Sequence, residues 1–512
     1  MGDEMSKKNH TVIKSIIYIL IMGVVLAVAT LLRYTRFWGV ATYGTVPFAQ
    51  IVFHLRAPLA SAATGLVKAY IKGYVKGYWW LALLLAAAVI VFRILYVRNT
   101  EGKPRLWKSL RNVSFGLAGG FALLELVILA NTFGVKDYIR DQMNPSSIYE
   151  EYYVEAEDVE IAFPEEKQNL IYIYMESMEA TYSDCENGGD MEDNLIPNLT
   201  ELAYEGDDFT AGETLGGGYS ATNSTWTIAA MVAQSSGTPL SVALDLNEHG
   251  SEINFLPGLT SLGDILEEEG YQQLILMGSG STFGGRWNYY TSHGNVTVFD
   301  YFTAVNNGDI PEDYKVFWGL EDAKLYTYAQ REILKLAEND EPFAVRILTV
   351  DTHFTDGYFC QLCENTYDTQ MANVIACADR QVSAFVEWIT EQDFYENTVI
   401  VIAGDHPNMD PVIEELMVEE DYERDVYYTI LNSVPSRSGS YEETTRRFTT
   451  MDIFPTTLAA MGVTIEGDRL GLGTNLYSEV PTLIELMGRE ELNAELAKVS
   501  RYYDKYIVVD GK

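Results

Sequence analysis

The stretch Leu170-Ile-Tyr-Ile-Tyr-Met-Glu176 is an apolar run of strand length that ends in a carboxylate. A later run, Thr398-Val-Ile-Val-Ile-Ala-Gly-Asp405-His406, has the same form and ends in Asp-His. Runs of β-branched and aromatic residues with polar ends predict buried strands. Ligands of open α/β sheets bind at the carboxyl ends of the strands. The two runs therefore predict that Glu176, Asp405 and His406 share one divalent metal ion.

Strand-like and helix-like segments alternate along the chain from residue 168. We expect strands at 169–175, 272–277, 343–350, 398–403 and 426–431. We expect helices at 198–204, 225–233, 259–269, 320–337, 371–391 and 451–461. This alternation predicts an α/β fold with a mainly parallel central sheet flanked by helices.

The charge of the chain is divided very unevenly. Residues 1–140 carry 17 Lys and Arg against 5 Asp and Glu, a net charge of +12, whereas residues 141–512 carry 18 against 68, a net charge of −50. So acidic a second part argues against nucleic acid as a partner, because phosphates would be repelled. A basic N-terminal part followed by an acidic C-terminal part favours a membrane anchor joined to a soluble domain.

Three apolar stretches near the N-terminus are long enough to cross a bilayer, which takes roughly 20 residues. They lie at about 12–32, 78–97 and 113–134. Lysines before the first stretch and basic residues between the last two predict that these ends are cytoplasmic, so the chain after residue 135 lies outside. The first stretch is too long for a simple signal peptide, which favours a retained anchor.

These patterns define the expected domains. We predict a membrane anchor at 1–140 with about three transmembrane helices, a linker at 141–165, a catalytic domain at 166–480 and a helical tail at 481–512. Within the anchor, residues 36–76 contain amphipathic segments that rest on the outer membrane surface or form a packed turn between helices.

All four cysteines fall in the predicted outer domain, where disulfides are stable. They are Cys185, Cys360, Cys363 and Cys377. The sequence favours one or two disulfides in a surface loop, with a pairing that cannot be read from the spacing. The alternative is that Cys360-Gln-Leu-Cys363 forms half of a zinc site, for which no second matching pair is present.

A hydroxyl-rich turn precedes one of the expected helices. It reads Ser220-Ala-Thr-Asn-Ser224-Thr225-Trp-Thr227. Ser224 and Thr225 are the candidate nucleophiles and metal ligands, because a hydroxyl needs a metal or a base to become an alkoxide. The positive end of the helix dipole would favour a phosphate there. The alternative is ordinary helix capping by these hydroxyls.

Two further side chains follow expected strands. Arg286 lies in a loop after residues 272–277, where a guanidinium could hold phosphate oxygens in a fork. His353 follows residues 343–350 and could donate to the phosphate or protonate the leaving oxygen. The alternative for both is an ordinary surface position. Together, the groups at one sheet edge predict phosphoryl transfer.

The catalytic part of the chain resembles the lipoteichoic acid synthase and phosphoglycerol transferase I family, within the alkaline phosphatase and sulfatase superfamily. The resemblance covers about residues 165–480 and is carried by the segments Asn169–Ser177, Thr225–Leu240, Asp351–Gly357, Gly404–His406, Asp452–Pro455 and Gly471–Gly473. It implies a multi-pass enzyme of the bacterial cell membrane with an extracytoplasmic catalytic domain.

The resemblance also implies an activity. Such enzymes transfer glycerol phosphate from phosphatidylglycerol to a glycan or polymer acceptor through a covalent enzyme ester. By motif, Glu176, Asp405 and His406 would bind the metal, usually manganese, with zinc or magnesium as alternatives. Arg286 and His353 would bind the phosphoglycerol group. The family's threonine nucleophile falls on Ser224, with Thr225 next to it, when residues are counted back from Gly237-Thr-Pro239.

Two other functions stay open at this point. One is a phosphoethanolamine transferase, phosphodiesterase or sulfatase on the same scaffold. A sulfatase would need a Cys/Ser-x-Pro-x-Arg signature, which the sequence lacks. The other is a non-catalytic envelope scaffold, which would bind no metal.

Overall fold

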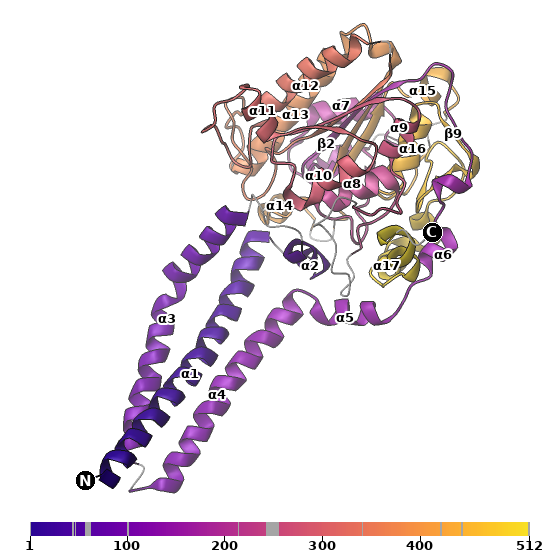
Figure 1. The fold of residues 1–512 in the computed structure, drawn as a ribbon. Helices are drawn as coiled ribbons and strands as arrows, with labels where there is room; N and C mark the ends of the chain where they lie inside the picture. Colours follow the sequence, from indigo (N-terminus) through magenta and orange to yellow (C-terminus); the bar gives the residue numbers. More distant parts are fainter. Residues whose placement is uncertain are drawn as a thin grey trace. The chain divides into compact units, whose positions relative to one another are not determined.

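The computed structural model describes residues 2–43, 46, 48–56, 63–99, 102–212, 214–241, 255–339, 341–419, 422–441 and 444–509. The chain forms two compact units (Figure 1). The first comprises Met1–Phe48 and Ala62–Asp137, and the second comprises Ala49–Ser61 and Tyr138–Lys512.

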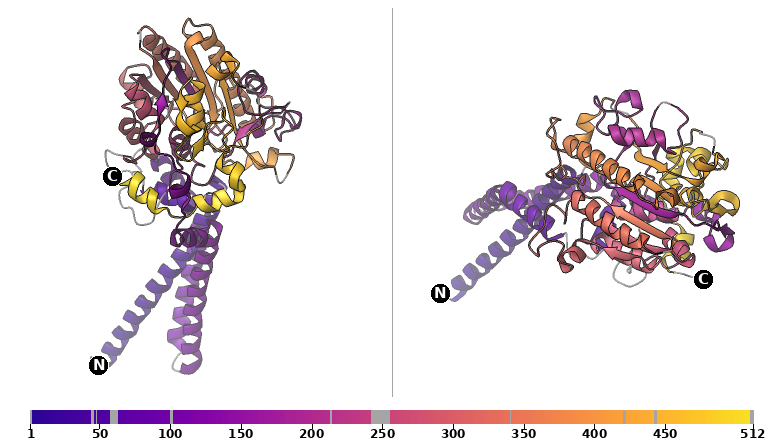
Figure 2. Two further views of the ribbon diagram at one scale, coloured as in Figure 1. Left: turned by 90° about the vertical axis from the view of Figure 1, so that its right-hand side faces the viewer. Right: turned by 90° about the horizontal axis from the view of Figure 1, so that it is seen from above.

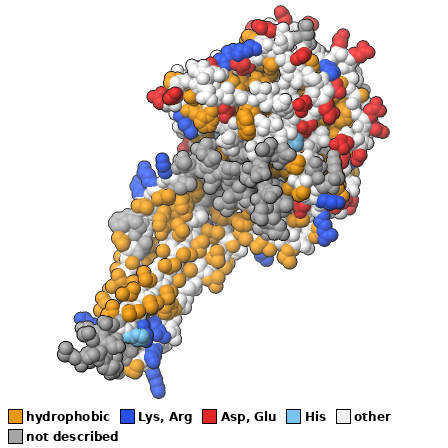
Figure 3. Space-filling model, viewed as in Figure 1, with side chains coloured by type: hydrophobic (Ala, Val, Ile, Leu, Met, Phe, Trp, Pro, Cys, Tyr) orange, Lys and Arg blue, Asp and Glu red, His pale blue; other side chains and the backbone are white. Residues whose placement is uncertain are grey.

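The first unit consists of three long helices: α1 (Gly2–Tyr43), α3 (Ala63–Asn99) and α4 (Pro104–Thr132). The helix α1 packs against both α3 and α4. Hydrophobic side chains cover much of the visible surface of these helices (Figure 3). Among the residues of these helices, Leu84 is 60% exposed and Leu117 is 70% exposed. Apolar surface exposed on this scale is typical of a helix that faces lipid.

Two helices are long and apolar enough to cross a membrane, at His10–Ala41 and Pro104–Thr132. A third candidate is a bent pair, Tyr70–Tyr78 with Leu83–Asn99. These segments overlap the three expected apolar stretches, of which the last, 113–134, runs two residues beyond Thr132. The number of crossings and their direction stay predictions. Side chains of residues 53–67, in the expected amphipathic segment, lie outside the described part of the chain.

The second unit is built on a seven-stranded sheet with the order β3-β8-β7-β2-β6-β4-β5. Its strands are β2 (Asn169–Met175), β3 (Gly217–Gly218), β4 (Gln272–Met277), β5 (Thr297–Phe299), β6 (Phe343–Leu348), β7 (Thr398–Gly404) and β8 (Val426–Leu431). The five strands from β7 to β5 are parallel, whereas β8 and β3 are antiparallel. The predicted α/β fold with a mainly parallel sheet is confirmed.

Helices cover both faces of this sheet (Figure 2). Ile171 and Ile173 of β2 belong to a core shared with α7 (Pro197–Glu205), α12 (Asp322–Ala337) and α13 (Gln370–Thr390). On the other face, Tyr172 donates a hydrogen bond to Gln234 of α8 (Thr227–Ser236) at 2.8 Å. Side chains alternate between the two faces of a strand, so a continuous apolar run such as β2 is buried on both sides.

The remaining elements are short. The helices are α2 (Phe48–Arg56), α5 (Val135–Met143), α6 (Ile148–Tyr152), α9 (Leu262–Glu268), α10 (Arg286–Ser292), α11 (Tyr301–Asn306), α14 (Val412–Leu416), α15 (Val434–Ser438), α16 (Ile453–Ala460) and α17 (Leu483–Leu496). Two small sheets pair β1 (Ile161–Ala162) with β9 (Thr464–Ile465) and β10 (Arg469–Leu470) with β11 (Gly473–Thr474). Single helical turns lie at Ala156–Asp158, Ala180–Tyr182, Cys185–Asn187, Phe283–Gly285, Tyr395–Asn397 and Glu466–Asp468, and a π-helix lies at Tyr503–Val508.

The expected linker and the expected tail pack together within the second unit. The Ser146 backbone N–H donates to the Val499 carbonyl at 2.8 Å, and Tyr502 donates to Glu155 at 2.6 Å. Tyr149 is buried in this contact. The tyrosines of the linker and of the tail therefore pack the two segments against each other.

The four cysteines are free thiols in the structure rather than the favoured disulfides. Cys185 is exposed, whereas Cys360, Cys363 and Cys377 lie together. The sequence spacing placed Cys360 and Cys363 close to each other but gave no sign that Cys377, on α13, would join them.

Candidate active site

The Glu176, Asp405 and His406 side chains meet at the carboxyl edge of the sheet. β2 and β7 are parallel neighbours, and Met175 is paired with Gly404. The residues that follow are therefore brought side by side. His406 Nε2 lies 3.5 Å from Glu176 Oε1 and 3.5 Å from Asp405 Oδ2. All three side chains are buried.

The fold holds one oxygen of Asp405 and leaves the other free. Asp405 Oδ1 accepts hydrogen bonds from the backbone N–H groups of Ser177 at 2.7 Å and His406 at 2.8 Å. Asp405 Oδ2 is buried and has no hydrogen-bond partner among the described residues. A buried acceptor without a partner is costly, so this oxygen is suited to a cation.

The His406 ring is oriented in the same way. His406 Nδ1 lies 2.9 Å from the Pro407 carbonyl oxygen, which makes Nδ1 the protonated nitrogen and leaves Nε2 as the ligand atom. One ligand atom from each of the three residues lies within 4.8 Å of the others. Two carboxylates and one imidazole are a donor set that fits manganese or zinc.

The electrostatics of this cluster also fit a cation. Burial, together with the neighbouring Glu176 carboxylate, raises the pKa of Asp405 to about 7. Burial lowers the pKa of His406, but the carboxylates of Asp405 and Glu176 outweigh this, so its pKa is raised. Negative charge is thus concentrated in a dry site, where a divalent ion would compensate it.

Thr227 supplies the hydroxyl that faces this cluster. It is the first residue of α8, and its Oγ1 lies 3.4 Å from Glu176 Oε2 and 3.5 Å from His406 Nε2. The hydroxyl therefore lies beside the metal-ligand atoms and at the N-terminus of a helix, where the backbone favours an anion.

The two hydroxyls singled out from the sequence have different surroundings. Ser224 Oγ donates to the Ala221 carbonyl at 2.6 Å. Thr225 Oγ1 is buried and makes no hydrogen bond to a described residue. In the described part of the chain, neither hydroxyl forms a hydrogen bond with Glu176, Asp405 or His406. The helix begins at Thr227 rather than at residue 225, which explains the offset.

Arg286 is buried and held at the start of α10. Its Nε donates to the Phe283 carbonyl, and its Nη2 donates to Ser279 Oγ and the Gly280 carbonyl, at 3.0–3.1 Å. Nη1 makes no hydrogen bond to the described residues. Burial lowers the pKa of Arg286 to about 10, and Glu176 and Asp405 are among the carboxylates that oppose the shift. Arg286 therefore lies within electrostatic reach of the metal ligands and remains a cation.

His353 follows β6 and is half-buried among aromatic rings. Its Nδ1 lies 2.6 Å from the Phe354 carbonyl oxygen, and its ring lies 4.8 Å from Trp318. Burial lowers the pKa of His353 to about 4, and the charges of His406 and Arg286 lower it as well. The imidazole is therefore neutral near pH 7, with the proton on Nδ1 and a lone pair on Nε2.

Two threonines that the sequence analysis overlooked join β2 to the loop after β6. Thr349 Oγ1 accepts a hydrogen bond from the Glu176 backbone N–H at 2.8 Å, and the Thr352 hydroxyl donates to the Glu176 carbonyl. They fix the backbone on both sides of a metal-ligand candidate. Their signal in the sequence is only their position, directly after an apolar strand.

A sheet of this topology with a Glu-Asp-His cluster and a helix-terminal hydroxyl defines a domain of the alkaline phosphatase and sulfatase class. The sulfatase family model matches residues 168–463, which is more than half of the chain. The chain belongs to this family.

Relatives and solved structures give a consistent picture. Phosphoglycerol transferase I of Xanthomonas campestris pv. campestris is 29% identical over 388 residues, which is 73% of this chain and 51% of that protein. Phosphoglycerol transferase I of Escherichia coli is 31% identical over 325 residues, which is 62% of this chain and 40% of that protein. The chain thus spans about half the length of the curated relatives it matches or less.

Among solved structures, lipooligosaccharide phosphoethanolamine transferase A of Neisseria meningitidis, an integral membrane protein, has a TM-score of 0.50 and 15% sequence identity. The comparison covers 96% of this chain and 88% of that one. The likeness supports the fold, and the family match confirms the resemblance drawn from the sequence motifs.

Proposed function

We propose that this protein is a metal-dependent phosphoglycerol transferase of the cell envelope. It takes glycerol phosphate from phosphatidylglycerol and passes it to a glycan or glycerol phosphate polymer through a covalent enzyme ester. The observation that carries the proposal is the hydroxyl of Thr227, 3.4–3.5 Å from Glu176 and His406 at a helix N-terminus. The relatives named phosphoglycerol transferase I support the choice of donor.

Glu176, Asp405, His406 and Thr227 would hold one divalent ion, which we assign as manganese, with zinc or magnesium as alternatives. When bound, such an ion lowers the pKa of a hydroxyl and offsets phosphate charge. The Asp405 Oδ2 atom, which has no hydrogen-bond partner among the described residues, and the His406 Nε2 atom, which faces the carboxylates, support this assignment.

Thr227 is the proposed nucleophile in place of Ser224 and Thr225. Thr227 loses its hydroxyl proton as its oxygen attacks the phosphorus of the lipid headgroup, the bond to the diacylglycerol oxygen breaks, and that oxygen takes up a proton to leave as diacylglycerol. Arg286 holds a phosphate oxygen with Nη1, the part of the guanidinium that the fold leaves unused. Because three other N–H groups anchor Arg286 to the loop after β4, its charge is already in place when the substrate binds.

His353 takes part in the second half of the reaction. Its neutral ring presents the Nε2 lone pair, so it can accept the proton of the acceptor hydroxyl. That hydroxyl oxygen attacks the phosphorus of the glycerophosphothreonine, the bond from phosphorus to the Thr227 oxygen breaks, and Thr227 regains a proton that balances the one taken up by His353. The second step thereby regenerates the enzyme.

We further propose that the first unit anchors the enzyme in the bacterial cell membrane by several spans, with the catalytic unit on the outer side. The basic residues between α3 and α4 and before α1 support this orientation. The anchor would hold the site near lipid headgroups.

The test is a labelling experiment on the full-length chain in detergent. Phosphatidylglycerol labelled in its headgroup is added with Mn²⁺, and diacylglycerol release and protein-bound label are measured. Thr227→Ala should abolish covalent labelling and lower turnover on the order of 10³-fold or more, while Ser224→Ala and Thr225→Ala should still become labelled. Label on Ser224 or Thr225 would refute Thr227. Transfer from phosphatidylethanolamine but not phosphatidylglycerol would refute the donor.

A further inference from the structure

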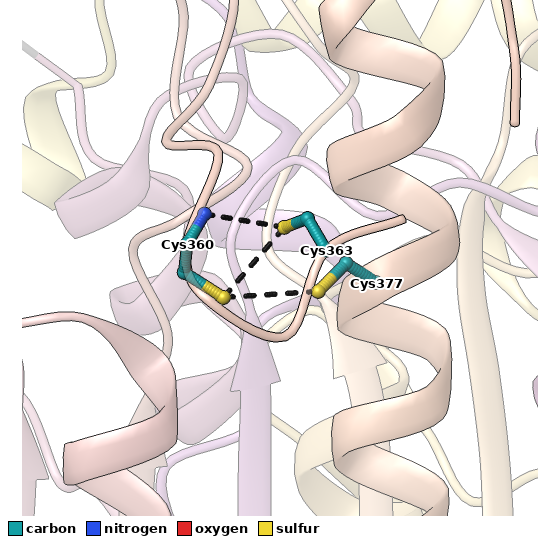
Figure 4. Close-up of side chains that lie close together, drawn as sticks. All are labelled: Cys360, Cys363 and Cys377. Atoms are coloured by element: carbon teal, nitrogen blue, oxygen red, sulfur yellow. Dashed lines mark hydrogen bonds between the residues drawn. The ribbon is translucent and has the colours of Figure 1, made fainter. Parts of the chain in front are cut away.

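Three of the four cysteines form a cluster outside the proposed catalytic site. Cys360 and Cys363 lie in the loop of residues 349–369, between β6 and α13, and Cys377 lies on α13 (Figure 4). The figure shows the three sulfur atoms turned toward one another from two separate segments.

The spacing of the sulfur atoms decides what the cluster can be. Cys360 Sγ lies 3.8 Å from Cys377 Sγ and 3.6 Å from Cys363 Sγ, and all three sulfurs lie within 4.8 Å of one another. A disulfide needs about 2.05 Å. A tetrahedral zinc ion with Zn–S bonds of about 2.3 Å places its sulfurs about 3.8 Å apart. The observed distances match thiolates around a metal.

The neighbouring polar groups are arranged for thiolates. The Cys360 backbone N–H points at Cys363 Sγ at 3.2 Å, and Gln381 Nε2 lies 3.4 Å from Cys377 Sγ. N–H donors of this kind stabilise metal-bound sulfur. Gln381 Oε1 is buried without a hydrogen-bond partner in the described part of the chain. If the amide is flipped, this oxygen takes the place of Nε2 and can serve as a fourth metal ligand.

We propose that Cys360, Cys363 and Cys377 bind a thiophilic divalent ion, Zn²⁺, as a structural site separate from the catalytic ion. Each thiol loses its proton to solvent as its sulfur binds the metal. The fourth position is filled by the Gln381 amide oxygen or by water. With the Gln381 oxygen as the fourth protein ligand the coordination is closed, which is the arrangement of structural zinc sites.

The site would tie the His353 loop to α13. Residues 349–369 contain no helix or strand and carry His353 near their start. Hydrogen bonds already hold parts of this loop: Gln370 Nε2 donates to the carbonyls of Asp356 at 3.2 Å and Gly357 at 3.1 Å, and the Asp356 backbone N–H donates to Asp410 Oδ2 at 2.7 Å. Long irregular loops are costly to order. An ion shared by two loop cysteines and one helix cysteine would lower that cost.

The test uses the full-length protein in detergent, purified with its thiols reduced and then loaded with Co²⁺ as a spectroscopic probe. Thiolate ligands give cobalt a charge-transfer absorption in the near ultraviolet, which the carboxylates and imidazole of the catalytic site cannot give. We expect this absorption in the wild type and in His406→Ala, and its loss in Cys363→Ser. Cys185→Ser is the matched control, because Cys185 lies outside the cluster, and it should keep the absorption.

Zinc content gives a second readout. After loading with Zn²⁺ and removal of the excess, Cys363→Ser should hold about one ion per chain less than the wild type. A mercurial that blocks the thiols should release that ion from the wild type, so the result does not depend on a variant that folds. Absence of the cobalt absorption in reduced wild type, or release of no zinc by the mercurial, would overturn the proposal. A disulfide that persists among the three cysteines after reduction would also overturn it.

Discussion

At the scale of single residues, the two carboxylate oxygens of Asp405 have different surroundings. Oδ1 accepts two backbone hydrogen bonds, and Oδ2 accepts none from the described residues. Asp405→Asn keeps an oxygen for the backbone and removes the charge. We expect metal affinity to fall at least about 100-fold. Even the substitution of a residue that only hydrogen-bonds to a metal ligand lowers metal affinity about 10–100-fold. Calorimetric titration of the full-length chain with Mn²⁺ measures this loss.

The control for this substitution is Asp379→Asn. Asp379 is also buried, but it accepts hydrogen bonds from the backbone N–H groups of Asn198 and Leu199. Its loss should cost stability and leave the affinity for Mn²⁺ unchanged. Equal loss of affinity in both variants would show that the effect of Asp405→Asn is a general one of removing a buried carboxylate.

A second prediction at this scale concerns pH. The pKa of Asp405 is raised to about 7, chiefly by burial, so the metal-free fold binds a proton that the unfolded chain, with an ordinary aspartate, releases near pH 4. The stabilisation that this proton gives the metal-free protein is therefore fully present below about pH 4 and is lost as the pH rises through about 7.

Metal binding must follow the opposite trend. The ion displaces that proton, so its affinity should rise at least tenfold per pH unit up to about pH 7 and then level off. The melting temperature with and without Mn²⁺, measured from pH 5.5 to 8.5, shows both trends. A gain from Mn²⁺ that is the same at all pH values would contradict the placement of a protonated Asp405 in the site.

At the scale of elements, the backbone at the end of β7 packs closely against the turn after β2. A Cβ on Gly404 would lie 1.9 Å from the Met178 carbonyl oxygen, which is backbone and cannot move alone. Gly404→Ala should therefore shift the turn that carries Glu176, weaken Mn²⁺ binding and reduce the free energy of unfolding by about 1–3 kcal/mol. Thermal unfolding and metal titration test this.

Gly212→Ala is the control, because a Cβ there meets no atom within 4 Å and Gly212 has no positive φ. It should leave both quantities unchanged. If Gly404→Ala bound Mn²⁺ as the wild type does, the close approach of the two turns would have no part in positioning the ligands.

Elements were predictable from the sequence where burial dictates a continuous apolar run. The strands β2, β4 and β8 have the expected bounds, and β7 extends one residue further, because each is covered on both faces. The short edge strand β5, Thr297–Phe299, carries too few apolar residues to be recognised. The helix α10, which presents Arg286, was expected as a loop, because its seven residues show no apolar period.

The candidate site was predictable only as far as strand ends determine it. Glu176 and the Asp405–His406 pair follow from the parallel pairing of β2 and β7. The position of the hydroxyl beside the cluster could not be predicted in this way, because four Ser and Thr residues lie at positions 222–227. Only the start of α8 at Thr227 shows which of them faces the cluster. Cys377 is separated from the other cysteines by a loop whose path the sequence does not determine.

At the scale of the whole molecule, the uneven distribution of charge suggests a physical role for the proposed anchor. Residues 141–512 carry a net charge of −50, and red acidic side chains are spread over the second unit in Figure 3. Phosphatidylglycerol is anionic, so on the proposed function a membrane rich in this donor would repel the acidic catalytic unit. The proposed anchor would oppose this repulsion by burying apolar helices in the bilayer.

A chain that starts at Tyr138 tests this account, since Tyr138–Lys512 lies in one compact unit apart from the long N-terminal helices. We expect it to bind Mn²⁺ as the full-length chain does but to release diacylglycerol slowly from phosphatidylglycerol vesicles at low salt. Raising the salt from 0.01 to 0.15 M shortens the screening length from about 30 to about 8 Å. The truncated chain should then speed up, while the full-length chain in the same vesicles changes little. A truncated chain that is fast at low salt would show that the acidic surface does not hinder access to the lipid.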